Sequence, residues 1–219
     1  RNRPVPDTAK IAVIAGTGAL PRLLAECCRL EQRPYVVVRF RGITLDWVQN
    51  HPVLDAEFEQ LQPMFQALRQ AGCTAAVFAG HIARPRLDLS RLDAKAGQLL
   101  TALAAGDDTT LGVAAQMFED EGLKITAAHD ILPDVLAAAG PLGRVLPSPA
   151  DMADIRRAAE IVAALGKADV GQGTVVAGGL CLGLETLQGT DAMLKFVAGT
   201  QGIKAGPAQS GVLFKAPKP

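Results

Sequence analysis

The sequence predicts an α/β fold with two domains, the first built on a mostly parallel sheet and the second smaller. In the first half of the chain, short apolar runs alternate with helical patterns, as in parallel strands joined by right-handed helical crossovers. After residue 140 the chain passes through a Pro- and Gly-rich stretch and then combines helices with a hairpin pattern. We therefore place the first domain at 1–140, a linker at 141–150 and the second domain at 151–219.

Four apolar runs of the first domain are typical of buried strands, at 10–16, 34–40, 74–80 and 123–128. Between them, apolar residues recur at helical spacing, which predicts three helices that face the core. The stripes that define these helices are Leu20, Leu23, Leu24, Cys27 and Cys28, then Leu61, Met64, Phe65 and Leu68, and finally Leu111, Ala114, Ala115 and Phe118. The first stripe places two adjacent thiols in the core.

Cap and turn signals define the start of the second domain. Ser148 is the expected N-cap of a helix, with Pro149 at its first position and Asp151 as the reciprocal capping partner. Gly178 and Gly179 then separate two apolar runs, as in a hairpin with a type I′ turn, which needs positive φ at both central residues. We expect the apolar side of the helix to consist of Met152, Ile155, Ala159 and Val162.

Composition narrows the classes of function. The 22 basic and 22 acidic residues balance, so the net charge gives no reason to expect nucleic acid as a partner. No apolar run approaches the roughly 20 residues of a spanning helix, and no secretory signal is visible. The four cysteines form no metal-binding or disulfide pattern, so we expect a reduced, cytoplasmic compartment.

A glycine-rich turn joins the first strand to the first helix, as in Rossmann-like nucleotide-binding domains. Backbone N–H groups at such a helix start can bind a phosphate. Arg39 and Arg41 end the second strand, where they would suit the 2′-phosphate of NADP. A tight turn without a ligand explains the same glycines equally well. The candidate binding residues are Gly16, Thr17, Gly18, Ala19 and Leu20.

A second candidate site follows the third strand, where Gly80 and His81 are expected beside the glycine-rich turn, because ligands of open α/β sheets lie at the carboxyl ends of the strands. Arg84 and Arg86 would add positive charge there. The alternative for His81 is an ordinary surface histidine. Further along, either of two aspartates is expected to cap the next helix or to accept a hydrogen bond from a ligand; these are Asp107 and Asp108.

A third candidate site lies after the hairpin. Glu185 ends the hairpin, and Thr190 is the expected cap of a helix that reaches Val197. A carboxylate beside a helix start can hold a divalent metal next to phosphate oxygens, although a cap and a favourable first-turn charge on Asp191 explain the same residues. Gln172 and Lys215, the latter on a last strand at 210–219, converge there if their strands are neighbours; Gly189 belongs to the same helix start.

Together these motifs resemble the LpxI-type UDP-2,3-diacylglucosamine pyrophosphatases of lipid A biosynthesis over essentially the whole chain. The motifs that carry the resemblance are IAGTGALP, AGHIARP, GDDTTL, DVGQGTVV, LETLQGTDAML and GVLFKAPKP, in that order. The most specific are the LQGTDAML run and the closing KAPKP. In the family a Glu commonly precedes Gly-Thr-Asp, whereas this chain has Gln188 there and retains the earlier Glu185.

The resemblance implies an N-terminal UDP-binding domain and a smaller C-terminal α/β hydrolase domain, with the substrate held between them. Such enzymes cleave UDP-2,3-diacylglucosamine with water and Mg²⁺ into UMP and 2,3-diacylglucosamine 1-phosphate (lipid X), with water attacking the phosphorus on the sugar side. They are peripheral proteins at the cytoplasmic face of the inner membrane, and a homodimer is kept open as the oligomeric state. The family continues beyond KAPKP with a segment that carries an essential aspartate, so we expect the second domain to be truncated at Pro219.

Roles for individual residues follow from this resemblance. The glycine-rich turn, His81 and the Asp107–Asp108 pair would hold the uridine nucleotide, and Gln172 and the Gly189–Thr190 pair would contact the substrate. Asp191, with Glu185, would hold Mg²⁺. Lys215 would stabilise the charge of the departing UMP as a catalytic residue, and Lys218 would bind substrate beside it. An NADP-dependent oxidoreductase and a non-catalytic nucleotide-sugar binding protein are the alternative functions.

Overall fold

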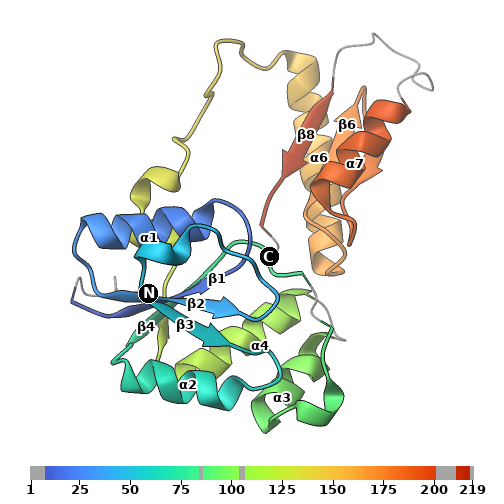
Figure 1. Cartoon of the computed structure of the whole chain (residues 1–219). Coiled ribbons are helices and arrows are strands. Elements are labelled where there is room, and N and C mark those ends of the chain that lie inside the picture. Colours follow the sequence, from blue (N-terminus) through green and yellow to red (C-terminus); the bar gives the residue numbers. More distant parts are fainter. Residues whose placement is uncertain (1–7, 84–85, 104–106, 201–210, 218–219) are drawn as a thin grey trace. The chain divides into compact units, whose positions relative to one another are not determined.

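A computed structural model describes residues 8–83, 86–103, 107–200 and 211–217 of the chain (Figure 1). Contacts between residues divide the chain into two compact units, which we call the first unit, Arg1–Ala138, and the second unit, Ala139–Pro219. Among the described residues, no helix is both long and apolar enough to cross a bilayer.

The first unit contains a parallel five-stranded sheet in the order β3-β2-β1-β4-β5. Its strands are β1 (Ile11–Ala15), β2 (Tyr35–Phe40), β3 (Val53–Ala56), β4 (Ala75–Ala79) and β5 (Lys124–Ile125). The expected mostly parallel sheet is confirmed. The sequence analysis missed β3, because three of its four residues are not buried and it lacks an apolar run. It also made the last strand too long, since only two of the residues at 123–128 pair with β4.

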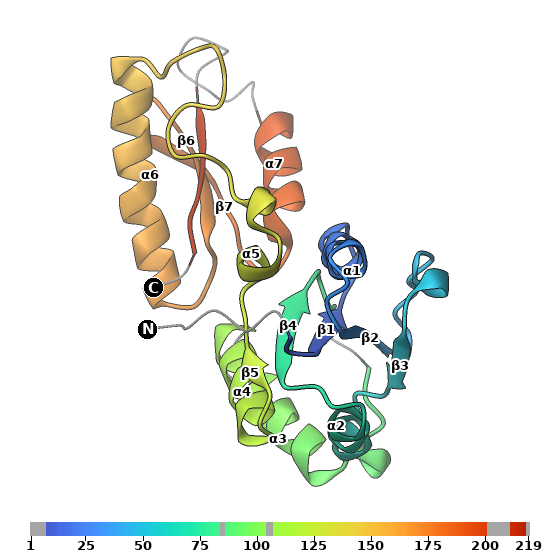
Figure 2. The ribbon, with the colours of Figure 1, turned by 90° about the vertical axis from the view of Figure 1, so that its left-hand side faces the viewer.

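Helices cover both faces of this sheet (Figure 2). One face packs against α1 (Leu20–Leu30), η1 (Val48–Asn50) and the short α5 (Ala128–Ile131), which η3 (Pro133–Val135) follows. The other packs against α2 (Leu61–Gln70), α3 (Ala94–Leu103) and α4 (Asp107–Asp120); η2 (Leu89–Arg91) precedes α3. The predicted stripe of α2 is confirmed, because Leu61, Met64, Phe65 and Leu68 are all buried. The strands β1, β2 and β4 are buried on both sides, as expected for a parallel sheet covered by helices.

The buried side of α1 differs from the predicted stripe. Leu23 is 48% exposed, and the buried residues are Pro21, Leu24, Ala25 and Cys28. The prediction favoured Leu over the small Ala25 and Pro21, although small residues let a helix approach a sheet closely. Cys28 is fully buried as expected, and this burial raises the pKa of its thiol to about 11. Cys27 is half-buried, and its thiol donates to the carbonyl of Ile131 at 3.4 Å.

The second unit contains an antiparallel three-stranded sheet in the order β7-β6-β8, between α6 and α7 (Figure 2). Its elements are α6 (Pro149–Lys167), β6 (Gly173–Ala177), β7 (Leu180–Leu184), α7 (Gly189–Gly199) and β8 (Val212–Lys215). The predicted start of α6 is confirmed, since Ser148 and Asp151 form a reciprocal capping box.

The hairpin turn of this unit is held by a buried carboxylate of α6. Gly178 and Gly179 have φ values of 56° and 77°, as a type I′ turn requires, so the predicted hairpin is confirmed. Their N–H groups donate to Asp154 at 2.9 and 2.7 Å, and Asp154 is only 5% exposed. The expected apolar side of α6 is therefore wrong in part: Met152 is 40% exposed, and the buried positions are Asp154, Ala158 and Val162.

Candidate functional site

The topology of the first unit creates a switch point between β1 and β4. From β1 the chain first fills the sheet towards β2 and β3, and it then returns to place β4 on the other side of β1. Ligands of open α/β sheets bind outside the carboxyl ends of the strands at such a point. Gly16 directly follows β1 and Gly80 directly follows β4, so two of the candidate sites lie side by side there.

The loops after β1 and β4 are bonded directly to each other. The N–H of Gly16 donates to the carbonyl of Ala79 at 2.8 Å. Thr17 and His81 exchange backbone hydrogen bonds at 2.8 and 3.0 Å, and the Thr17 hydroxyl adds a bond to the His81 carbonyl at 3.1 Å. The N–H groups of Gly16 and Thr17 are thus engaged by the protein, and the expected contact of these two residues with a ligand stays a prediction.

Steric space explains two of the glycines in these loops. A Cβ on Gly16 would lie 2.5 Å from the carbonyl oxygen of His81. A Cβ on Gly80, whose φ is +84°, would overlap the carbonyl oxygen of Thr17. Both glycines therefore permit the close approach of one loop to the other.

Three candidate residues of the glycine-rich turn remain at the N-terminus of α1. Gly18 has φ +98° with open space around it, Ala19 precedes the helix and provides no capping side chain, and Leu20 begins it. Pro21 has no N–H, so the donors of this helix start are the N–H groups of Gly18, Ala19 and Leu20 before it and of Arg22 after it. This group is the part of the turn that can bind an anion.

A polar cavity of about 570 Å³ adjoins Thr17 and Gly18. Arg22 and Glu26 of α1 line one side, and the loop after β2 supplies much of the rest. This loop was not predicted to be part of a site, because its polar residues follow no recognisable motif. The cavity-lining residues of the loop are Thr44, Leu45, Asp46, Trp47, Gln49, Asn50 and His51. The cavity therefore offers hydrogen-bonding groups of both kinds next to the helix start.

A buried histidine fixes one wall of this cavity. The His51 side chain is 1% exposed, and its Nδ1 lies 2.6 Å from the Tyr35 hydroxyl. Its Nε2 lies 3.7 Å from a Glu26 oxygen. The rings of Trp47 and His51 pack edge-on, with 5.4 Å between their centroids. Burial raises the pKa of Tyr35, and the hydrogen bond from Arg29 lowers the pKa of Glu26. These contacts hold the loop after β2 against α1.

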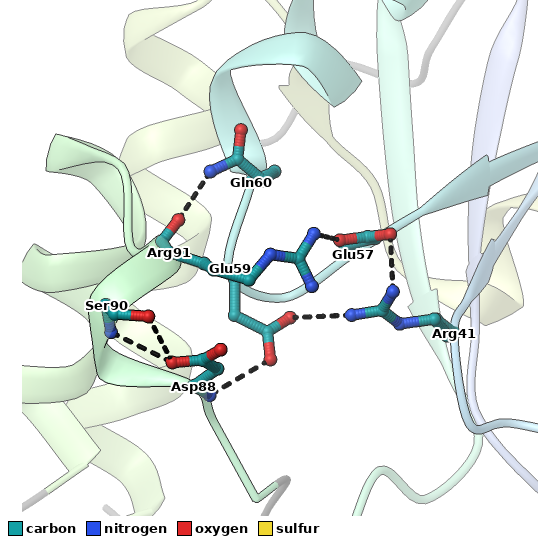
Figure 3. Close-up of polar contacts among 7 residues, drawn as sticks. All are labelled: Arg41, Glu57, Glu59, Gln60, Asp88, Ser90 and Arg91. Atoms are coloured by element: carbon teal, nitrogen blue, oxygen red, sulfur yellow. Dashed lines mark hydrogen bonds and ion pairs between the residues drawn. The ribbon is translucent and has the colours of Figure 1, made fainter.

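The arginines expected to suit a 2′-phosphate are paired with carboxylates. Arg39 forms a bidentate pair with Asp55 at 2.7 and 3.0 Å, and this hydrogen bonding holds the pKa of Asp55 below its ordinary value. Arg41 and Arg91 lie around Glu57, with Arg41 at 2.8 Å (Figure 3). All five residues line a cavity of about 1280 Å³ at the ends of β2 and β3. The neutralised charge disfavours an NADP site.

Glu59 links this arginine cluster to the segment before α3 (Figure 3). It is 8% exposed, lies 3.9 Å from Arg41 and accepts the N–H of Asp88 at 3.2 Å. That backbone hydrogen bond lowers the pKa of Glu59. The Gln60 amide donates to the carbonyl of Arg91, which attaches η2 to the same place. The cluster therefore has a structural function in joining β3 to the segment before α3.

The other candidates of the first unit are placed as follows. The His81 residue is exposed, and its described hydrogen bonds are those of its backbone to Thr17. Asp107 and Asp108 are the first two residues of α4, and their expected role as a cap or as a ligand contact stays a prediction. Arg86 is exposed, and Arg84 lies outside the described residues.

In the second unit, three predicted site residues form one cluster. Thr190 of α7 donates its hydroxyl proton to Oε1 of Glu185 at 2.6 Å. Lys215, at the end of β8, lies 2.8 Å from the same oxygen and 2.7 Å from the Thr190 hydroxyl. The Glu185 side chain is 8% exposed and that of Lys215 is 42% exposed. The cluster thus has a buried carboxylate inside and an ammonium group at the surface.

The strand β6 supplies the backbone that surrounds Glu185. The N–H of Glu185 donates to the Gly173 carbonyl at 2.8 Å, and Gly173 lies opposite Lys215 in the β6–β8 pair. The Gln172 carbonyl accepts the N–H of Ala216 at 3.1 Å, so Gln172 and Lys215 do lie on neighbouring segments. These two residues were expected to converge only if their strands are neighbours, and the backbone pairing meets this condition.

The predicted cap at the start of α7 needs correction, and the other residues predicted there are placed as follows. Thr190 is not the N-cap, because α7 begins at Gly189 after Gln188 and the Thr190 hydroxyl bonds Glu185 instead. Gln188 contacts Thr186 and, at 3.5 Å, the Leu184 carbonyl, so it closes the loop before the helix. Asp191 is exposed in the first turn of α7, and Lys218 lies outside the described residues.

The described residues offer few ligands for a metal ion. They contain no group of three or more His, Cys, Asp or Glu side chains in a metal-binding arrangement. The Oε1 atom of Glu185 already accepts from an ammonium and a hydroxyl, and its Oε2 atom is buried next to Gly173, so this carboxylate does not fit a metal ligand. Asp191 does fit, because Mg²⁺ commonly takes one or two carboxylates together with substrate phosphates and water.

Fold and sites together define a class of protein: an open α/β unit with a parallel sheet, joined to a smaller unit with a Glu–Thr–Lys cluster. Comparisons with known proteins make this class specific. The LpxI N-terminal domain matches residues 10–135, and the LpxI C-terminal domain matches residues 138–219. The chain belongs to the LpxI family.

A curated relative and a solved structure complete the comparisons. The UDP-2,3-diacylglucosamine pyrophosphatase LpxI of Caulobacter vibrioides is 38% identical over 216 residues, which cover 96% of this chain and 77% of the relative. A crystal structure of N5-carboxyaminoimidazole synthase from Aspergillus clavatus is 16% identical and covers 90% of this chain and 37% of that chain. Its TM-score of 0.28 is too low to support any conclusion about the fold.

Proposed function

We propose that this chain hydrolyses the pyrophosphate bond of UDP-2,3-diacylglucosamine, giving UMP and 2,3-diacylglucosamine 1-phosphate (lipid X) in lipid A biosynthesis. The name of the Caulobacter relative and its 38% identity over 96% of this chain support the substrate. The observation that carries the proposal is the meeting of two motifs at one point. Glu185 and Thr190 of LETLQGTDAML form a single hydrogen-bonded cluster with Lys215 of GVLFKAPKP.

The first unit is proposed to bind the uridine nucleotide. The N–H groups of Gly18, Ala19 and Leu20 suit a phosphate, because the start of α1 carries no capping side chain and concentrates positive charge. The polar cavity beside them offers hydrogen-bonding groups for the nucleoside. His81 adjoins the same crevice through its bonds to Thr17, and it keeps its proposed contact with the ligand.

The second unit is proposed to act on the phosphate groups. Water adds to the phosphorus on the sugar side, the bond from that phosphorus to the bridging oxygen breaks, and the bridging oxygen leaves with UMP. Lys215 stabilises the negative charge that develops on the departing phosphate, because its side chain is partly exposed while Glu185 and Thr190 hold its ammonium group. Phosphoryl transfer depends mostly on such positioning and electrostatics.

Magnesium is proposed as the cofactor, with Asp191 as the residue of this chain that holds it. A bound Mg²⁺ would neutralise the diphosphate and favour loss of a proton from water. Asp191 suits this task because it is an exposed carboxylate in the first turn of α7, one residue from the Thr190 of the cluster. The proposed place of action is the cytoplasmic face of the inner membrane, to which the protein would bind peripherally.

Release of UMP from UDP-2,3-diacylglucosamine tests the proposal directly. We expect release with Mg²⁺, none with excess chelator, and equimolar lipid X. The Asp191→Ala and Lys215→Ala variants should each lose about 100-fold or more in kcat, the usual effect of removing one group that stabilises transition-state charge. Wild-type protein that binds UDP but releases no UMP would support the nucleotide-sugar binding alternative, and saturable NADPH binding would support the oxidoreductase.

A further inference from the structure

We propose that Glu185 is a positioning residue for Lys215 rather than a metal ligand, so that Lys215 alone of this cluster contacts the substrate phosphate. The inference rests on the proposed function and specifies how the cluster serves it. It departs from the expectation, drawn from sequence, that Glu185 and Asp191 together hold Mg²⁺.

Donor and acceptor capacity within the cluster leads to this assignment. A threonine hydroxyl has one proton, and the Thr190 proton points to Glu185 at 2.6 Å. Thr190 accepts from Lys215 at 2.7 Å, so its hydroxyl has no proton left for a phosphate oxygen. The Lys215 ammonium has three protons, of which Glu185 and Thr190 receive two. Among the described residues these are its two partners, so one N–H remains to donate to an anion.

Burial gives the three groups different functions. The side chain of Glu185 is 8% exposed, whereas that of Lys215 is 42% exposed. A lysine side chain is flexible, and its ammonium group occupies a fixed position only where partners hold it. Glu185 and Thr190 are those partners, and they bind the ammonium from the protein side. The remaining proton is therefore directed to the exposed side of the cluster.

The surrounding backbone is shaped to accommodate this carboxylate. A Cβ on Gly173 would lie 2.5 Å from Oε2 of Glu185, and one on Gly171 would overlap the Glu185 carbonyl oxygen. Glycines at both positions of the Gly-Gln-Gly segment thus create the space for Glu185. Replacing a buried ion pair by apolar side chains of similar volume often leaves a protein equally stable or makes it more stable. The space is better explained by the placement of Lys215.

A double-mutant cycle on the protein tests the assignment, with wild type, Glu185→Gln, Lys215→Ala and the combination compared by kcat and KM. Loss of correct placement by about 1 Å can cost about 100-fold in rate. We expect Glu185→Gln to lower kcat about 10- to 100-fold with little change in KM, and the double variant to be no slower than Lys215→Ala. Multiplicative losses would overturn the proposal.

The magnesium dependence separates positioning from metal binding. If Glu185 only positions Lys215, the Mg²⁺ concentration for half-maximal rate stays within about twofold in Glu185→Gln and rises at least 10-fold in Asp191→Asn, because charge on a ligand governs metal affinity. A 10-fold rise in Glu185→Gln would overturn the proposal. Asp154→Asn is the matched control: it alters another buried carboxylate of this unit, and we expect a lower Tm with unchanged kcat.

Binding of inorganic pyrophosphate without Mg²⁺ provides a readout that does not depend on hydrolysis. Calorimetry should show about 10-fold weaker binding for both Lys215→Ala and Glu185→Gln, and no further loss in the double variant. Equal pyrophosphate affinity in wild type and Glu185→Gln would overturn the positioning role. If wild type binds pyrophosphate in this pattern but does not hydrolyse UDP-2,3-diacylglucosamine, the proposed function fails while the role of Glu185 stands.

Discussion

Thr17 and His81 exchange two backbone hydrogen bonds, at 2.8 and 3.0 Å, and thereby join the loops that follow β1 and β4. These two strands flank the switch point of the sheet. Main-chain hydrogen bonds therefore hold the two loops together at the proposed ligand crevice of the first unit. Its geometry depends on glycines that contact the opposite loop, and this dependence can be measured.

Gly80→Ala should destabilise the first unit and weaken UDP binding. The new Cβ would overlap the Thr17 carbonyl oxygen, and φ at this position is +84°. Gly72→Ala is the matched control, because Gly72 also has a positive φ, +74°, but has open space around it. We expect about 1 kcal/mol of lost stability in the control and about 2–4 kcal/mol in Gly80→Ala, by urea unfolding. Equal losses would show that the loops do not need this close approach.

Asp154→Ala should destabilise the second unit. The variant removes both hydrogen bonds that the carboxylate accepts from the turn at Gly178 and Gly179. Hydrogen bonds to a charged group contribute about 1.5–3 kcal/mol each, and water can reach the exposed turn, so we expect a loss of about 2–3 kcal/mol by thermal unfolding. Glu160→Ala, on the exposed side of α6, should change stability by less than about 0.5 kcal/mol. A similar small change in Asp154→Ala would contradict the bracing of the hairpin by α6.

Local signals predicted the elements whose stability is local. The cap at Ser148, the glycine turn at 178–179 and the apolar stripe of α2 are each determined by neighbouring residues, and the structure has all three. The errors concern residues whose partners lie outside their own helix or strand. Thr190 has the composition of a cap, but a glutamate five residues earlier and a lysine from β8 determine what its hydroxyl does.

The same limit explains what was missed in the candidate sites. The glycines at 16 and 80 match a ligand-binding pattern, yet each contacts the other loop. No spacing rule connects His51 with Tyr35 and Glu26, since a loop, a strand and a helix bring them together. The arginines at 39 and 41 looked available in the sequence because their acids belong to β3 and the residues after it, where no strand was predicted.

Alkylation should distinguish the cysteines by burial. Cys181 is exposed, whereas Cys28 and Cys73 are buried, and burial raises the pKa of both buried thiols. With iodoacetamide at pH 8, mass spectrometry should find Cys181 modified at least about 10-fold faster than either buried thiol. All four should react at similar rates in urea. Rapid native modification of Cys28 would contradict the packing of α1 on the sheet.

Raising the pH above 9 should destabilise the first unit through Cys28. Burial disfavours the thiolate, so the pKa of this thiol rises from 9.0 to about 11 on folding. Between these values the unfolded chain has lost the proton and the folded chain keeps it, so the free energy of unfolding falls as pH rises. The stabilisation is fully present below pH 9 and decreases by up to about 3 kcal/mol as the pH approaches 11.

The Cys28→Ala variant isolates this contribution from the other groups that titrate in the same range. It should be less stable than wild type at pH 8, because a buried sulfur is lost, but it lacks the titrating thiol. Urea unfolding at pH 8, 9, 10 and 11 should therefore show the difference between the two proteins narrowing steadily above pH 9. Parallel curves across this range would mean that the Cys28 thiol ionises equally well in the folded and unfolded chains, which its complete burial against the sheet forbids.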